Sequence, residues 1–152
     1  MNTEEFKANL DAIATECLAV RVRMLSRVVT KIYDEELRPL HLKASQMNIL
    51  VAAAKMGVAR PVALCELLHL DVSTLSRNVE RMRQRGWLEV VPEAEDARAQ
   101  PFRLTAEGRT LLQQAVPRWK EAQEKTRRML GDGVVNLLGK TFKQLQRAKT
   151  AS

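Results

Sequence analysis

The sequence predicts a mainly α-helical fold with one small β-hairpin, and three observations support this prediction. Apolar residues recur at three- and four-residue steps near both ends of the chain, which is the spacing of helices with one apolar side. Two short apolar runs between residues 86 and 105 flank a polar stretch, as in a hairpin. The length of 152 residues, with 45% hydrophobic and 28% charged residues, fits one globular domain.

The first helix is expected from residue 8 to residue 38. Pro39 ends it, because proline lacks the backbone N–H that the next turn requires. One apolar stripe runs along this helix, formed by Leu10, Ile13, Cys17, Val20, Met24, Val28 and Ile32.

Capping residues delimit the next three helices. Ser45 is expected to cap a helix that ends at Gly57, and a short helix follows Pro61. Asp71 is a strong N-cap residue for the helix after that, and Gly86 stands where a glycine commonly follows a helix.

Two strands and two helices complete the chain. The strands are expected at residues 87–91 and 102–104, and Thr105 should cap the long helix that follows. Pro117 should kink that helix. Gly131 and Gly133 should interrupt it before a last amphipathic helix.

The two terminal regions carry more apolar surface than the middle of the chain can cover. Helices at 8–38 and 109–148 have full apolar stripes, whereas the segment between them, 45–108, has only about 60 residues. The terminal helices are therefore expected to pack against those of a second copy in an isologous homodimer.

Composition excludes several classes of protein. No apolar run approaches the roughly 20 residues that cross a bilayer, so a cytoplasmic protein is expected. Two cysteines and two histidines show no metal-ligand spacing, and no phosphate loop, nucleophile motif or His–carboxylate pair indicates catalysis. We expect no enzyme, metal or cofactor.

Net charge indicates a nucleic-acid partner only weakly. The formal charge is +7, but residues 109–152 carry 10 of the 25 Lys and Arg and only 3 of the 18 Asp and Glu. The excess therefore lies outside the capped helix after Asp71, and the distribution of side chains on that helix becomes the stronger evidence.

The order of elements, two helices joined by a turn and then a hairpin, is typical of a winged helix-turn-helix. On a helical wheel the second of these helices has one apolar side, formed by Val72, Leu75, Val79 and Met82. The opposite side carries Thr74, Arg77 and Arg81, with Ser73 and Gln84 beside them. Arg77 could bind guanine in a DNA major groove, and Arg83 or Arg85 could hold a phosphate of the DNA backbone. Two alternatives stay open, a merely solvated helix surface and a winged-helix module that binds proteins instead of DNA.

Two stretches resemble the MarR family of bacterial transcriptional regulators. Asp96-Ala97-Arg98 followed by Leu104-Thr105-Ala106-Glu107-Gly108 is similar to the wing signature of that family. LDVSTLSRNVERMRQRGWLEVV, residues 70–91, is similar to its recognition helix and first wing strand.

The resemblance implies one domain that forms an intertwined winged-helix homodimer on double-stranded DNA. Most members repress transcription and release DNA when a small molecule or an oxidant acts on them. The positions implied as DNA contacts are Ser73, Thr74, Ser76, Arg77 and Arg81 on the recognition helix, and Arg98 on the wing with Asp96 as its partner. Asp96 is expected to orient the Arg98 guanidinium toward the minor groove.

The signal that such a regulator would sense is less clearly marked. Arg23, Tyr33 and Trp119 could line a cavity for an aromatic or phenolic effector, or the two aromatic residues could simply belong to the core. Cys17 could sense an oxidant, or it could be a packing thiol on the apolar stripe. Cys65 is expected in the core, and His41 and His69 at short turns.

Overall fold

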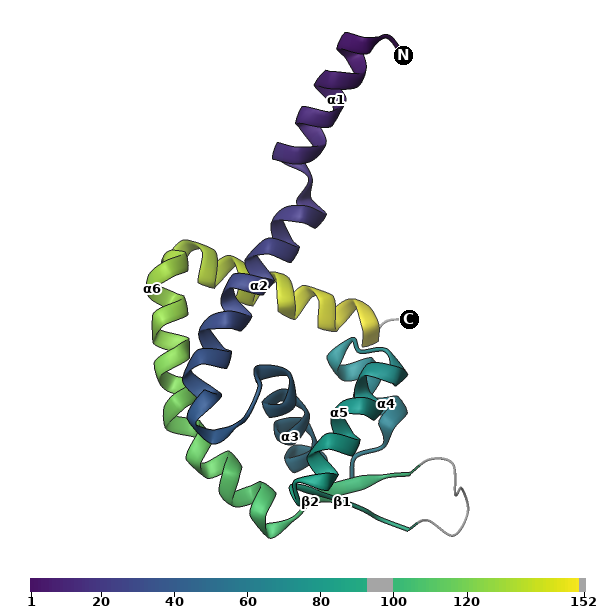
Figure 1. Ribbon diagram of the computed structural model, residues 1–152, viewed down its shortest axis with the longest axis vertical. Helices are drawn as coiled ribbons and strands as arrows, with labels where there is room; N and C mark the ends of the chain where they lie inside the picture. Colours follow the sequence, from purple (N-terminus) through teal and green to yellow (C-terminus); the bar gives the residue numbers. More distant parts are fainter. Residues whose placement is uncertain (93–99, 151–152) are drawn as a thin grey trace.

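The computed structural model describes residues 1–92 and 100–150, with side chains through residue 147 (Figure 1). It has the predicted architecture, a winged helix-turn-helix made of helices and one two-stranded antiparallel sheet. The elements in chain order are α1 (Thr3–Glu16), α2 (Leu18–Leu37), the 3₁₀ turn η1 (Arg38–Leu40), α3 (Ala44–Met56), α4 (Pro61–Leu68), α5 (Val72–Gln84), β1 (Leu88–Val90), β2 (Phe102–Leu104) and α6 (Ala106–Thr150).

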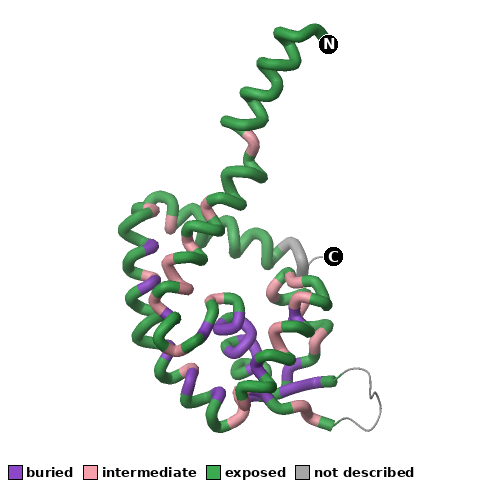
Figure 2. Tube along the Cα trace, in the orientation of Figure 1, coloured by how far each residue is buried: buried purple, intermediate pink, exposed green. Residues whose placement is uncertain are grey.

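The hydrophobic core lies where α3, α4 and α5 meet the hairpin. Its largest fully buried side chains include Ile49 and Leu50 of α3, Leu64 of α4 and Met82 of α5. Figure 2 shows the buried positions gathered in this half of the molecule and along one side of α6. The core therefore holds α5 in a fixed place beside the hairpin.

The hairpin has the register that its alternating residues favour. Leu88 pairs with Leu104 and Val90 with Phe102, so the apolar side chains share one face. Phe102 is fully buried, and its backbone also exchanges two hydrogen bonds with Ala59, at 2.8 and 3.0 Å. This contact attaches the base of the hairpin to the segment between α3 and α4.

The expected single first helix is wrong, because the chain leaves helical geometry at Cys17, where φ is −60° and ψ is 113°. Neither proline nor glycine marks this break in the sequence. The Thr15 carbonyl, which the break leaves without a helical partner, accepts a hydrogen bond from Arg21 Nε at 3.0 Å. In the sequence the apolar stripe continues from α1 into α2, although the helical geometry is interrupted between them.

The start of α3 also differs from the expectation, because Lys43 and not Ser45 occupies the N-cap. Gln46 Oε1 accepts from the Lys43 N–H at 3.1 Å, and Asp34 Oδ1 accepts from the Ala44 N–H at 2.8 Å. The cap is thus supplied partly by α2, ten residues earlier in the chain, which pattern reasoning on the local sequence did not find.

The long helix α6 begins and breaks close to the expected places. Thr105 Oγ1 accepts from the Gly108 N–H at 3.0 Å, so the predicted cap is confirmed. Pro117 lies inside the helix, and the non-helical backbone falls at Gly131, with φ 75° and ψ 156°. The expected interruption is therefore confirmed at Gly131, whereas Gly133 has already returned to the helix. The chain changes direction at this break (Figure 1).

The terminal helices leave large apolar side chains exposed. α1 contains no buried residue (Figure 2). Ile13 of α1 and Met24 of α2 each keep 60% of their surface exposed, and Leu137 of α6 keeps 62%. Among the described residues no helix is both long enough and apolar enough to cross a membrane.

Candidate nucleic-acid interface

α5 begins at Asp71, whose carboxylate bonds the first turn. Asp71 Oδ1 accepts from the Thr74 N–H at 2.7 Å, which confirms the predicted N-cap. The hydroxyls of Ser73 and Thr74 also donate to this carboxylate, at 2.6 and 2.7 Å. The hydroxyl of Ser73, then the hydroxyl and N–H of Thr74, hold the pKa of the Asp71 carboxyl well below its usual range.

The two sides of α5 separate as the helical wheel predicts, with one exception. Leu75 and Met82 are buried, and Val79 packs against the core from a half-buried position. Val72 is 68% exposed, because the first turn of α5 extends beyond the core. Val72 lines a groove of about 280 Å³ between α4, α5 and the hairpin.

The opposite side of α5 faces solvent and is polar. Thr74 is half-buried, and the other predicted contact residues are exposed: Ser73, Ser76, Arg77 and Arg81. The five residues lie on successive turns of one helix, so the structure brings together all the predicted positions that it describes on α5. Asp96 and Arg98 lie outside the described residues.

The junction between α5, the hairpin and α6 explains the motif Leu-Thr-x-x-Gly at residues 104–108. Thr105 Oγ1 donates to the Gly86 carbonyl at 2.6 Å, and the Thr105 N–H donates to the Trp87 carbonyl at 3.2 Å. A Cβ at Gly108 would lie 2.2 Å from Trp87 O, so glycine permits the close approach of α6. Gly86 has φ 74°, the positive value expected of a glycine after a helix.

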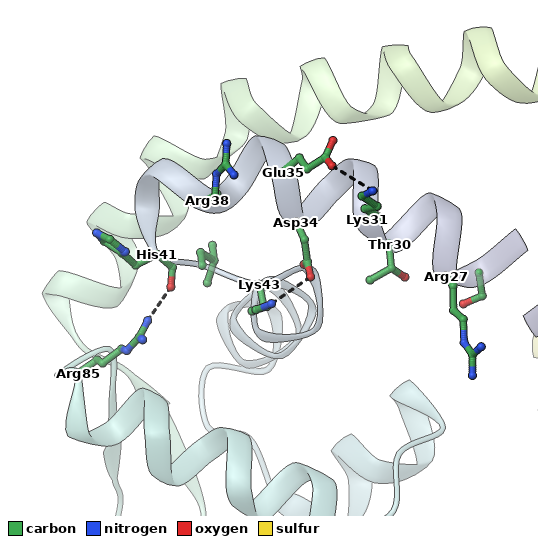
Figure 3. A pocket seen from close by; sticks show the side chains of 11 residues that line it. Arg27, Thr30, Lys31, Asp34, Glu35, Arg38, His41, Lys43 and Arg85 are labelled. Carbon is green, nitrogen blue, oxygen red and sulfur yellow. Dashed lines mark hydrogen bonds and ion pairs between the residues drawn. The ribbon is translucent and has the colours of Figure 1, made fainter. Parts of the chain in front are cut away.

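A cavity of about 690 Å³ lies between α2, the segment after it and the end of α5 (Figure 3). Five cations and two carboxylates are among the residues that line it: Arg27, Lys31, Arg38, Lys43 and Arg85, with Asp34 and Glu35. Two of these cations are paired, Lys31 with Glu35 at 3.9 Å and Lys43 with Asp34 at 3.5 Å. The excess of positive charge suits an anionic ligand.

Arg85 connects this cavity to the recognition helix. It is the C-cap residue of α5, and its Nη1 donates to the His41 carbonyl at 2.6 Å (Figure 3). The guanidinium also lies over the Trp87 ring, 4.9 Å from the centroid. Sequence reasoning missed this site, because Arg85 and His41 are 44 residues apart and the sequence suggested Arg85 as a contact to the DNA backbone and His41 as a turn residue.

The residues predicted to hold an effector are not brought together at this cavity. Arg23 is exposed on α2, and Trp119 keeps 39% of its surface exposed on α6. The Tyr33 hydroxyl donates to Gln123 of α6, and burial raises the pKa of Tyr33. None of the three lines the cavity shown in Figure 3.

Both cysteines are half-buried, and each histidine ends a short helix. Cys17 is half-buried at the break between α1 and α2, and half-buried Cys65 packs against the core. His41 and His69 are exposed and end η1 and α4 in left-handed conformation, with φ 51° and 52°. Within the described part of the chain no cluster of three His, Cys, Asp or Glu side chains could hold a metal ion.

Comparison with known proteins relates this fold to one family. The family model of the MarR family matches residues 42–99. The multiple antibiotic resistance protein MarR of Salmonella typhimurium is 28% identical over 118 residues, which cover 76% of this chain and 82% of that protein.

Solved structures extend the likeness over nearly the whole chain. The Mycobacterium tuberculosis transcriptional regulator MOSR, solved in complex with DNA, is 32% identical, with a TM-score of 0.75 over 90% of this chain and 98% of that one. BpsR of Bordetella bronchiseptica, whose DNA binding is regulated by 6-hydroxynicotinic acid, is 21% identical with a TM-score of 0.76 over 87% of this chain and 94% of that one. The chain belongs to the MarR family of transcriptional regulators.

Proposed function

We propose that this protein is a sequence-specific repressor that binds double-stranded DNA through α5 and the hairpin. The observation that carries the proposal is the exposed polar side of α5, which the core and the hairpin hold in a fixed position. Its relative MOSR, similar over almost its whole length, has been solved with DNA. Residues 45–108 would form the DNA-binding core of a single domain.

The residues of α5 suit a major groove. Arg77 can donate two hydrogen bonds to O6 and N7 of one guanine. Of the two candidates for a phosphate contact we choose Arg83, whose Nε lies 3.7 Å from Glu80 Oε2, because Arg85 donates to the His41 carbonyl. The other proposed contacts are Ser73, Thr74, Ser76 and Arg81 on α5 and the wing residues Asp96 and Arg98.

A second copy of the chain would cover the exposed apolar sides of the terminal helices, 8–38 and 109–148. Side chains such as Ile13, Met24 and Leu137 are too exposed for a stable free surface. A twofold dimer would place two recognition helices about one helical turn of DNA apart, so the operator should be a pseudo-palindrome with half-sites roughly 10 base pairs apart.

The cavity at the end of α5 is the proposed site for a small-molecule signal. Five cations against two carboxylates favour an anion, and a volume of about 690 Å³ accommodates an aromatic or phenolic acid. BpsR, regulated by an aromatic carboxylic acid, has the same fold. An oxidant acting at Cys17 is the second candidate signal, because this thiol sits at the break between α1 and α2.

The test is selection of bound duplexes from a random pool, followed by affinity measurements on the selected site and on random DNA. We expect a pseudo-palindrome and clear discrimination between the two DNAs. Binding without sequence preference that vanishes with salt would instead favour a winged-helix module whose partner is a protein.

A further inference from the structure

The hydrogen bonds at the start of α5 have fixed directions. A carboxylate that is ionised has no hydrogen to give, so Asp71 can only accept. Each hydroxyl therefore directs its hydrogen at Asp71, Ser73 toward Oδ1 at 2.6 Å and Thr74 toward Oδ2 at 2.7 Å. The same bonds lower the pKa of Asp71, so the carboxyl remains ionised through the physiological range.

Because both hydroxyl hydrogens are donated to Asp71, the oxygens of Ser73 and Thr74 can offer only lone pairs to any other partner. A serine or threonine hydroxyl has one hydrogen and two lone pairs, and here the hydrogen is already used. One lone pair of Thr74 also receives a long hydrogen bond from Arg77 Nη2, at 3.4 Å. Ser73 and Thr74 thus meet an approaching partner as acceptors.

Few groups on DNA can donate to such acceptors. Phosphate oxygens, guanine O6 and N7 and thymine O4 all accept, whereas adenine N6 and cytosine N4 donate in the major groove. The negative charge of Asp71 further opposes a phosphate at this turn.

We propose that Asp71 is a specificity-determining residue that holds Ser73 and Thr74 as acceptors, so that the first turn of α5 selects bases with an amino group, adenine or cytosine. The proposal rests on the proposed function, in which α5 enters the major groove. Asp71 itself is a positioning residue, because it acts through the two hydroxyls and not on the base.

The variant Asp71→Asn tests this role without removing the helix cap. Asparagine is as good an N-cap residue as aspartate, and its Oδ1 can still accept from the Thr74 N–H. The NH₂ group of asparagine would replace Oδ2 and donate to Thr74 Oγ1, so the hydroxyl hydrogen of Thr74 would be free to point outward. Ser73 would still donate to Oδ1 and keep its acceptor role.

The measurement is selection from random duplexes with wild type and Asp71→Asn, followed by binding titrations on the selected sites. At one position in each half-site, Asp71→Asn should change the preferred base from adenine or cytosine to guanine or thymine. One neutral hydrogen bond favours the matching class of base by about fivefold, so a reversed preference should shift the affinity ratio between the two classes by roughly 25-fold. The shift should disappear when Asp71→Asn is combined with Thr74→Ala.

Glu80→Gln is the matched control for charge. It removes one carboxylate from the same helix, and the contacts of Glu80 are with Arg83 and Gln84. This variant should tighten binding to all sequences alike, because it reduces repulsion of the DNA, and it should leave base preference unchanged. Thermal unfolding of each variant checks that α5 remains folded.

The outcomes separate this inference from the proposed function. Absence of sequence preference in the wild type would overturn the proposed function itself. A wild type that selects a site, with an identical preference in Asp71→Asn, would overturn only the inference. A uniform loss on every sequence would likewise overturn it, since Asp71 would then serve only as a helix cap.

Discussion

The close approach of α6 to the Trp87 backbone at the base of the hairpin predicts that Gly108→Ala destabilises the protein. The added Cβ would lie 2.2 Å from Trp87 O and 3.1 Å from Trp87 C, both of them backbone atoms. Carbon–oxygen contacts normally lie at about 3.3 Å or more, so α6 and the hairpin would have to separate by about 1 Å. That movement also strains the hydrogen bond from the Thr105 N–H to the same carbonyl.

The expected cost follows from two opposing effects. Forcing extra atoms into a packed contact costs about 1–3 kcal/mol, and a rigid backbone partner places this case at the upper end. Replacing glycine by alanine inside a helix raises the free energy of unfolding by about 0.5–1 kcal/mol. The net loss in free energy of unfolding should be about 2 kcal/mol, equivalent to a fall in Tm of about 4–8 °C.

Urea and thermal unfolding followed by circular dichroism measure this loss, at one fixed protein concentration because the stability of the proposed dimer would depend on concentration. Gly139→Ala is the control in the part of α6 that follows the break at Gly131, since a Cβ there meets nothing within 4 Å in this chain. The control should be unchanged or slightly more stable. If Gly108→Ala unfolds at the same midpoint as the wild type or later, the proposed role of this glycine is wrong.

Further predictions concern binding and assembly. Arg77→Ala should cost about 1–3 kcal/mol and relax base preference, whereas Arg83→Ala should weaken specific and random DNA alike and flatten the salt slope; equal losses on both DNAs for Arg77→Ala would refute its assignment. Hydrodynamic mass at micromolar concentration should correspond to a dimer, and a stable monomer would contradict the assembly. Arg85→Ala should reduce the effect of aromatic carboxylic acids on DNA affinity, and an undiminished effect would count against the cavity. Asp96→Ala should weaken operator binding although it removes a negative charge, with Arg98→Ala weaker still; tighter binding by Asp96→Ala would show that the carboxylate only repels DNA.

Local rules predicted the recognition helix and the hairpin well. The hydrogen-bond partners of Asp71, Gly86 and Thr105 lie no more than 19 positions away in the chain. Their capping roles follow from the residue type, because aspartate and threonine accept backbone hydrogen bonds and glycine adopts a positive φ. The two apolar runs were enough to predict the hairpin, and the structure adds its register, with Leu88 opposite Leu104. Helical periodicity correctly assigned the apolar and polar sides of α5, except at Val72. This residue lies in the first turn of α5, which extends beyond the core.

Features set by tertiary contacts could not be predicted in this way. The break at Cys17 falls within a continuous apolar stripe, and periodicity shows which side of a helix is apolar but not whether the helix is interrupted. The cap of α3 comes from Asp34 on another helix. The cavity depends on Arg85 meeting the segment around His41, a contact that only the folded chain brings about.

Because α1 buries no side chain, how fast a newly made chain is degraded should depend on the concentration of the protein. A helix of 14 residues that buries no side chain depends on its internal hydrogen bonds, and helices of this length are marginal in water. At high dilution the first 16 residues should therefore unfold while the core around α3 stays intact, and they should be the earliest site of proteolytic cleavage. In the proposed dimer a second copy would cover α1, so a cell with few copies would degrade unpaired chains and the amount of dimer would rise more steeply than the rate of synthesis.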